Sequence, residues 1–293
     1  MSEEEPSTLL RGRAEALAAP LPPLLAEAER LAAAVMLGEH GRRRAGMGDE
    51  FWQYRPAHIG DDARAVDWRR SARSDAHFVR EKEWQAAQTV SLWVDVSRSM
   101  GFSGERGRPS KADRARLLAL AATVLLIRAG ERVGLADGSL AARGGHAQLL
   151  RLAEALPLDD PADYGQPRAE ALVPHGRALF LSDFFGDPRS VEAALTRAAD
   201  QGVRGVLLMV LDPQEESFPF AGRTNFESMT GALRHEVLQA RDLRGRYAGR
   251  LAERKERLRL LAQATGWQFS CHHTDAAPAA ALLWLYRALE RRT

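Results

Sequence analysis

Short apolar runs alternate with helical stretches from residue 89 to the end of the chain, and this alternation constrains the fold more than any other feature. Residues 89–97, TVSLWVDVS, form a short and mainly apolar run, which is typical of a parallel strand covered on both faces. A helical stretch follows at about 112–129 and ends at Gly130, a common residue at a helix end. Further apolar runs lie at 132–137, 177–185, 203–213 and 267–275, and helical stretches follow them at 146–156, 188–202, 247–266 and 277–292. The sequence therefore predicts an α/β fold, with a doubly wound, mostly parallel sheet flanked by helices.

The first 88 residues do not share this alternation and predict two appended parts. Residues 1–40 place prolines ahead of apolar residues at helical spacing, so we expect an N-terminal helical extension. Residues 41–88 are dense in charge and tryptophan and are broken by glycine and proline, which favours short strands and loops. We expect this segment to pack on the main domain, residues 89–293. Within that domain, Asp137–Gly138 predicts a tight turn into a short edge strand.

Composition limits the classes of function. The chain has 293 residues and a formal net charge of +2, too near zero to indicate nucleic acid as a partner. Its longest apolar runs have 11 residues, against roughly 20 for a membrane-spanning helix. The acidic start predicts no secretory signal, and the single cysteine, Cys271, fits a reducing compartment. Because no phosphate-binding glycine loop is present either, we expect a cytoplasmic protein that binds no nucleic acid or nucleotide and does not insert into a membrane.

Polar side chains follow two of the predicted strands, at the edge of the sheet where ligands bind in such folds. Asp95, Ser97 and Ser99 follow the first apolar run, and Asp183 closes RALFLSD. Two carboxylates and two hydroxyls are hard oxygen ligands that suit Mg²⁺, and an open position on the ion could accept an acidic residue of a partner. The alternative is structural, with Asp95 and the serines capping the following loop through its backbone amides.

The pattern D-x-S-x-S at a strand end, with an aspartate closing a later strand, resembles the metal-ion-dependent adhesion site of the von Willebrand factor type A domain. A wider resemblance covers the chain from about residue 41 to its end. The stretches 48–83, 95–100 (DVSRSM) and 211–222 (LDPQEESFPFAG) closely resemble the "domain of unknown function 58" family. The family pattern R-x-Y-x-x-G-D-x-x-R-x-I-D-W-x-x-S-A-R is matched at Arg55, Gly60, Asp61, Arg64, Asp67, Trp68, Ser71, Ala72 and Arg73, with Ala57 and Val66 as departures.

The resemblance implies a type A-like fold and a bacterial, non-catalytic adaptor. Such an adaptor would work with a MoxR-type AAA+ ATPase and its client protein in assembly or maturation. The candidate partner-binding residues are Arg55, Asp61, Arg64, Asp67, Trp68 and Arg73. The alternative for these charged residues is an internal salt-bridge network that fastens residues 41–88 to the sheet.

One departure concerns the metal site. A complete adhesion site includes a threonine from a third loop, whereas this chain has no serine or threonine from 140 to 181. Asp163 or a water molecule would replace the threonine, or the site is degenerate. Two further hypotheses stay open at this point: a metal-dependent hydrolase that uses Asp95 and Asp183, and a structural scaffold with a vacant metal site. A zinc site at 271–275 is disfavoured, because the adjacent His272 and His273 point to opposite faces of a strand.

Overall fold

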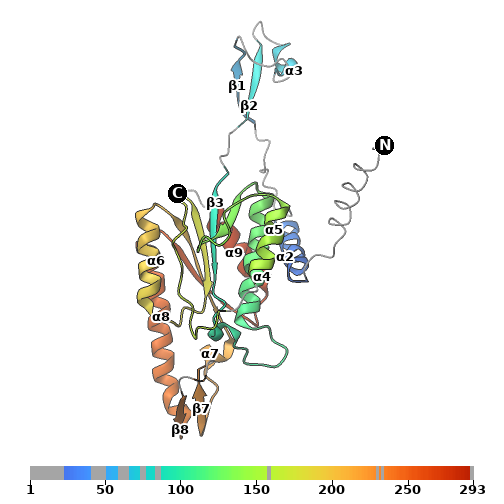
Figure 1. Cartoon of the computed structure of the whole chain (residues 1–293). Helices are drawn as coiled ribbons and strands as arrows, with labels where there is room; N and C mark the ends of the chain where they lie inside the picture. The colour runs from blue at the N-terminus through green and yellow to red at the C-terminus, as the bar shows by residue number, and fades with distance from the viewer. Residues whose placement is uncertain are drawn as a thin grey trace, which may run out of the picture.

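A five-stranded parallel sheet with helices on both faces forms the body of the protein (Figure 1). The computed structural model describes residues 23–40, 51–58, 66–72, 77–82, 87–156, 160–228, 231 and 234–290. The strands are β3 (Thr89–Val94), β4 (Arg132–Leu135), β5 (Arg177–Ser182), β6 (Arg204–Leu211) and β9 (Gln268–His273). Each pairs in parallel with its neighbours in the order β4-β3-β5-β6-β9. The predicted α/β fold with a mostly parallel sheet flanked by helices is confirmed.

The strand order places a switch point between β3 and β5. The chain leaves β3 for β4 on one side and returns to β5 on the other, and ligands bind at such reversals in open α/β sheets. The loops after β3 and β5 are the ones that carry the predicted site. The fold therefore brings the candidate residues to the position where a crevice is expected.

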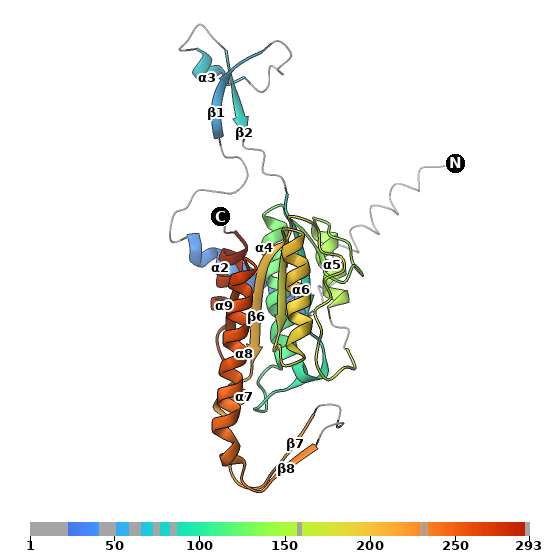
Figure 2. The same ribbon diagram turned by 90° about the vertical axis from the view of Figure 1, so that its left-hand side faces the viewer.

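The two faces of the sheet pack into two separate cores. The helices of one face are α2 (Pro23–His40), α4 (Lys111–Arg128), α5 (His146–Ala155) and α9 (Pro278–Glu290). The helices of the other face are α6 (Pro188–Asp200) and α8 (Arg244–Ala264) (Figure 2). Successive strand residues alternate between the two cores, with Leu179 and Leu181 on the first and Ala178 and Phe180 on the second. This alternation explains why the strands read as unbroken apolar runs.

Helix α4 is the central helix of the first core, and its start is specified locally. Ser110 is the N-cap residue and forms a reciprocal capping box with Asp113, which stabilises the first turn. The helix ends before Gly130, whose φ of +84° is a left-handed conformation that glycine adopts at low cost. Within the described residues, no helix is both long and apolar enough to cross a bilayer.

The predicted N-terminal helix exists over residues 23–40, and the rest of that predicted extension, residues 1–22, lies outside the described residues. Helix α2 buries Leu25, Ala28, Ala32 and Val35 in the first core and packs on α4 and α9. It is therefore part of the main core, and its burial of an apolar stripe explains why the helical period is visible in the sequence.

Residues 51–82 contain a hairpin that lies apart from the sheet in both views (Figures 1 and 2). Strand β1 (Phe51–Pro56) pairs antiparallel with β2 (Phe78–Lys82), and the short helix α3 (Trp68–Ser71) lies beside β2. Short strands were predicted here. The predicted packing of this segment on the main domain is not seen for its described residues, which lie beyond the amino ends of the sheet strands.

Two features at the sheet margins differ from the sequence-based expectation. The turn at Gly138 leads to a single antiparallel bridge between Val133 and Arg143, in place of the predicted edge strand. The second feature is a projection after β6, which the sequence did not predict. It contains α7 (Pro213–Ser217) and an antiparallel hairpin of β7 (Thr224–Glu227) and β8 (Arg234–Val237). These strands are short and largely exposed, so they carry little apolar periodicity.

Candidate functional site

The structure brings the four predicted metal ligands to the carboxyl edge of the sheet. Asp95 follows β3, Ser97 and Ser99 lie at and within the 3₁₀ turn Arg98–Gly101, and Asp183 follows β5. All four side chains are buried. Buried polar groups require internal partners, so the hydrogen bonds of each group decide what this edge of the sheet can do.

Both carboxylate oxygens of Asp95 accept hydrogen bonds from the surrounding loops. Oδ1 accepts from the Ser97 amide at 2.9 Å, and Oδ2 accepts from the Ser182 hydroxyl at 2.6 Å. Burial raises the pKa of the Asp95 carboxyl, the nearby Asp183 adds to the rise, and the hydrogen bonds from Ser182 and Ser97 offset part of it. The bond to the Ser97 amide is the loop-capping contact of the structural alternative.

The third loop closes over Asp95 with backbone rather than with a side-chain hydroxyl. The Ser99 amide donates to the Asp163 carbonyl at 2.9 Å, and the Arg98 amide donates to the Ala162 carbonyl at the same distance. Gly165 lies so close to Asp95 that a Cβ atom on it would be 2.3 Å from the carboxylate. The hydroxyls of Ser97 and Ser99 are 3.3 Å apart and form a hydrogen bond. This loop therefore supplies packing and backbone acceptors to the site.

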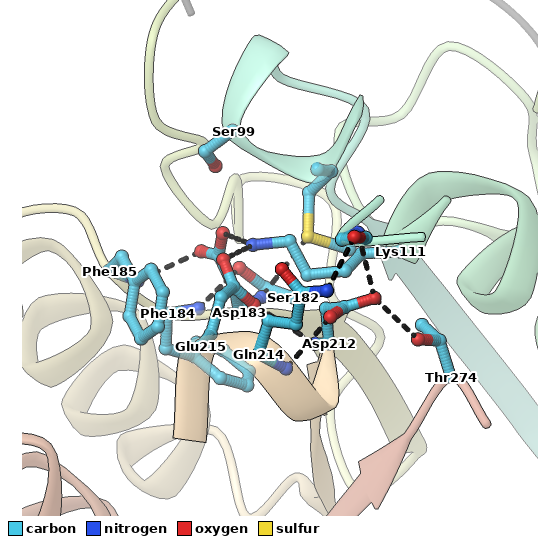
Figure 3. Close-up of polar contacts among 12 residues, drawn as sticks. Ser99, Lys111, Ser182, Asp183, Phe184, Phe185, Asp212, Gln214, Glu215 and Thr274 are labelled. Carbon is cyan, nitrogen blue, oxygen red and sulfur yellow. Dashed lines mark hydrogen bonds and ion pairs between the residues drawn. The ribbon is translucent and has the colours of Figure 1, made fainter. Parts of the chain in front are cut away.

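A lysine that the sequence analysis did not single out lies at the centre of the site. Lys111 is the first residue of α4, and it is fully buried (Figure 3). Its ammonium donates to Asp183 Oδ2 at 2.7 Å and to Glu215 Oε1 at 2.6 Å. It also lies over the Phe185 ring, 5.0 Å from the centroid. These are short, charge-assisted hydrogen bonds, with a cation–π contact on the remaining side.

Glu215 reaches the lysine because α7 holds it. Asp212 is the N-cap residue of α7 and forms a reciprocal capping box with Glu215, whose Oε2 accepts from the Asp212 amide at 3.0 Å. The other carboxylate oxygen of Glu215 is then directed to Lys111. Asp212 itself is buried and accepts from Gly104, Arg108, Gln214 and Thr274. One short helix thus ties the loop after β6 to the start of α4.

Lys111 stays charged in this site. Burial by itself lowers the pKa of the ammonium, but Asp183 and Glu215 outweigh burial, so the pKa of Lys111 lies above its usual value. Breaking such a buried pair by removing one partner typically costs about 3–5 kcal/mol, because an uncompensated charge stays behind. We therefore expect Lys111 to stabilise this edge of the sheet.

These contacts do not fit a bound divalent cation. The Asp183 carboxylate accepts from Lys111 through Oδ2 and from the Phe185 amide through Oδ1 at 2.9 Å. Both Asp95 oxygens are also engaged, and a metal ion beside Asp183 would meet the Lys111 ammonium as a like charge. Among the described residues, no group of three or more His, Cys, Asp or Glu side chains is arranged to hold a metal ion.

A polar cleft of about 340 Å³ opens beside Asp95. Its charged lining residues are Asp95, Asp137, Asp160 and Arg168, and the described residues that line it include no histidine, cysteine, lysine or serine. The cleft therefore offers carboxylates and one guanidinium, and its described lining places no imidazole, thiol, ammonium or serine hydroxyl beside them.

The six candidate partner-binding residues are only partly described. Asp61, Arg64 and Arg73 lie outside the described residues, and Arg55 lies in β1 opposite Val79. The remaining two, Asp67 and Trp68, lie at the start of α3.

Asp67 organises the backbone around α3. Its Oδ1 accepts from the Arg69 amide, and its amide donates to the Phe78 carbonyl. Trp68 is 59% exposed and contacts the His77 ring edge-on at 5.6 Å. The choice between a docking surface and an internal salt-bridge network stays open for this segment as a whole.

Sequence reasoning missed Lys111 and Glu215, although a signal was present for both. The chain has 41 basic residues, and only those at 82, 111 and 255 are lysines. A lysine at the start of α4 is therefore unusual, because the other basic residues are nearly all arginines. Glu215 lies within the 211–222 stretch that carries the family resemblance. Their pairing was not visible, because the two residues are 104 positions apart.

Comparison with known proteins shows the family. The model of the family "Protein of unknown function DUF58" matches residues 53–257, and this chain belongs to that family. The chain is 29% identical over 235 residues to the uncharacterized protein Rv1480 of Mycobacterium tuberculosis H37Rv, covering 74% of this chain and 73% of the relative. The uncharacterized protein Mb1516 of Mycobacterium bovis matches equally well.

Two solved structures align with this chain at low sequence identity. BatB from Bacteroides thetaiotaomicron, a conserved hypothetical protein, aligns with a TM-score of 0.40 at 11% identity. An aerotolerance-related membrane protein from Bacteroides fragilis aligns with a TM-score of 0.41 at 12% identity. Both alignments cover 69% of this chain and 98% of the other chain.

Proposed function

We propose that this chain is a non-catalytic interaction module that works with a MoxR-type AAA+ ATPase on the assembly or maturation of a client protein. The observation that carries the non-catalytic part is the state of the carboxylates at the sheet edge. Asp95, Asp183, Asp212 and Glu215 all accept hydrogen bonds from groups of the same chain. Such an edge is a fixed surface rather than a reactive centre.

The hydrolase alternative lacks its chemical groups in the described part of the site. A metal-dependent hydrolase needs a cation beside its carboxylates, whereas Asp183 is paired with the Lys111 ammonium and Asp95 accepts hydrogen bonds from Ser97 and Ser182. His272 lies in β9 and contacts Arg114, and His273 contacts Glu216. Neither imidazole contacts the Asp95–Asp183 pair.

A screen with generic phosphatase and peptidase substrates tests this part. We expect no turnover above background with or without Mg²⁺ and Mn²⁺. Metal-dependent turnover that is lost in Asp183→Asn would support the hydrolase instead. The variant Glu192→Gln, on exposed α6 and paired with Arg257, controls for the loss of a carboxylate elsewhere.

The surface that we propose for the partner is the β1–β2 projection, which we define as the hairpin of β1 and β2 together with the short helix α3 beside it. Exposed tryptophan is uncommon outside interfaces, and buried tryptophan anchors carry a large share of binding energy in many complexes. Trp68 is 59% exposed and belongs to the segment that matches the family pattern. A docking role for this segment also agrees with its position apart from the sheet (Figure 2), and none of its described residues belongs to either hydrophobic core.

A binding assay with matched variants tests the partner. The tagged chain would be titrated against a MoxR-type ATPase of the same source organism, with Trp68→Ala as the test variant. We expect a loss of about tenfold or more in affinity, the effect of a typical interface anchor. Leu238→Ala is the control, since Leu238 is 75% exposed and follows β8 at the opposite end of the molecule. Equal binding by wild type and Trp68→Ala would reject this surface, and no binding by wild type would reject the ATPase as the partner.

We propose the cytoplasm as the place of action, from the composition and the single cysteine alone. Fractionation of cells that express the tagged chain checks this, and recovery of the chain in the membrane fraction would contradict it.

A further inference from the structure

Lys111 is unusual in two respects, its position in a helix and its burial. It is a cation in the first turn of a helix, where the helix dipole favours anions, and it is a lysine with no exposed surface, which is rare unless the charge is paired. A sequence that breaks local rules at one position commonly does so at a functional site. The compensation for both departures has to come from the residues around the ammonium.

Carboxylates on two separate loops stabilise the Lys111 ammonium. In an adhesion-type site, a metal ion would join such loops. Asp183 follows β5 and Glu215 lies on α7, and the Lys111 ammonium lies between their carboxylates at 2.7 and 2.6 Å (Figure 3). Asp95 raises the local negative charge further, since it lies close enough to Asp183 for the two carboxylates to interact. One lysine therefore neutralises carboxylates from separate segments, which is the task of a cation in an adhesion-type site.

We infer that the Lys111 side chain takes the place of the divalent cation, so this chain carries a built-in ammonium where an adhesion site carries a metal. The loops after β5 and β6 are joined by Lys111, and binding at this edge proceeds without a metal bridge to an acidic partner residue. The metal-bridging form of the adhesion site is the alternative that this inference replaces. The inference does not depend on the ATPase partnership.

Truncation of Lys111 should leave a cavity that can hold a metal ion. Replacing Lys111 by alanine removes the ammonium and its four-carbon stem, and it leaves Asp183 Oδ2 and Glu215 Oε1, which meet that ammonium in the wild type, facing the vacated space. Oxygen ligands of this kind suit Mg²⁺ and Mn²⁺. The truncated variant should therefore gain the metal site that the wild type lacks.

Metal titration of matched variants tests the inference. EDTA-stripped wild type, Lys111→Ala and Lys255→Ala would be titrated with Mg²⁺ and Mn²⁺ by calorimetry, and their melting temperatures measured with and without each ion. We expect no saturable heat for wild type or Lys255→Ala, and a saturable heat together with a rise in melting temperature for Lys111→Ala. The double variant Lys111→Ala/Asp183→Asn should lose both gains. Lys255 is a suitable control because it is a partly exposed lysine paired with Glu216.

Two results would overturn the inference. Saturable binding of Mg²⁺ to wild type that is lost in Asp183→Asn would show a working metal site beside the lysine. A folded Lys111→Ala that neither binds nor is stabilised by either ion would show that the ammonium does not occupy a cation position. Neither result involves the ATPase, so a failure here is distinguishable from a failure of the proposed function.

A measurement on wild type covers the case in which Lys111→Ala does not fold. Because the chain has three lysines, a ¹⁵N-lysine sample gives few side-chain signals, which Lys82→Arg and Lys255→Arg assign by elimination. We expect the Lys111 ammonium signal to resist exchange with water and to stay unchanged in millimolar Mg²⁺. A shift or loss of that signal on addition of Mg²⁺ would show that metal displaces the lysine and would contradict the inference.

Discussion

The candidate functional residues at the two ends of the molecule differ in how deeply they are buried. At the carboxyl edge of the sheet, Asp95, Asp183 and Lys111 are buried and bonded to one another's loops. On the β1–β2 projection, Trp68 is exposed and lies apart from the main sheet. The motif that is most conspicuous in the sequence is thus buried within the chain, and the surface that we propose for a partner lies in the less regular segment.

This contrast has a physical basis. A buried charge is tolerated only when its partners are fixed, so a cluster of buried charges makes its surroundings rigid. An exposed aromatic ring gains little within the monomer and gains much when a partner buries it. The following predictions test the contrast, from the largest expected effect to the smallest.

Loss of the Lys111 charge should have the largest effect on stability. Lys111→Met keeps most of the side-chain length and leaves Asp183 and Glu215 without their cation, so we expect unfolding free energy to fall by about 3–5 kcal/mol. Chemical denaturation measures it, and Lys255→Met, at a partly exposed pair, should cost less than about 1 kcal/mol. A loss below about 1 kcal/mol for Lys111→Met would show that the sheet edge is not held by this lysine.

Crowding of Asp95 should have the next largest effect. In Gly165→Ala the new Cβ would lie 2.3 Å from the Asp95 carboxylate, so the third loop must move, and we expect a loss of about 1–3 kcal/mol. Gly245→Ala in the first turn of α8 is the matched control, because no atom lies within 4 Å of its added Cβ. Alanine there should be neutral or slightly stabilising. Equal stability of the two variants in thermal unfolding would mean that the third loop is not fixed against Asp95.

The buried, neutral His272 should make the folded protein less stable at mildly acidic pH. Burial, together with the charges of Arg114 and His273, lowers the pKa of His272 to about 4, although Asp275 acts to raise it. The unfolded chain therefore takes up a proton between about pH 6.5 and 4 that the folded chain excludes, and this contribution to stability is present above pH 6.5 and is lost as the pH falls.

We expect the stability of wild type to fall by about 1–2 kcal/mol more than that of His272→Gln between pH 7.5 and 5. The raised pKa of Asp95 has the opposite effect on stability, because it favours the folded state as the pH falls. This effect is present in both proteins, so the difference between them isolates the contribution of His272. Denaturation curves that change in parallel with pH would refute the prediction.

Removal of Trp68 should have the smallest effect on stability. Its ring is mostly exposed, so Trp68→Ala should change the unfolding free energy by less than about 0.5 kcal/mol, even where it lowers affinity for a partner. Phe180→Ala, which removes a fully buried ring from the second core, should cost about 3–5 kcal/mol. A large destabilisation by Trp68→Ala would assign the tryptophan to packing instead of docking.

Several elements followed directly from local sequence signals. The end of helix α4 was marked by Gly130, and its start is fixed by the capping box of Ser110 and Asp113, a local signal that the sequence analysis did not use. The central strands β5 and β6 were recognisable because both of their faces are covered, so that most of their positions are apolar. The β7–β8 hairpin was missed because its exposed strands carry no such pattern, and the edge strand after Gly138 was wrong because a turn signal does not specify how many residues pair beyond it.

The sequence by itself determined the order of the main strands and helices along the chain, because that order depends on periodicity. It also placed Asp95, Ser97, Ser99 and Asp183 at one edge of the sheet, because parallel strands all end at the same edge. Only the tertiary structure decided what those residues do. Lys111 meets Asp183 across 72 positions and Glu215 across 104 positions. Such pairings depend on how loops from different strands converge, so local sequence does not encode which cation neutralises the carboxylates.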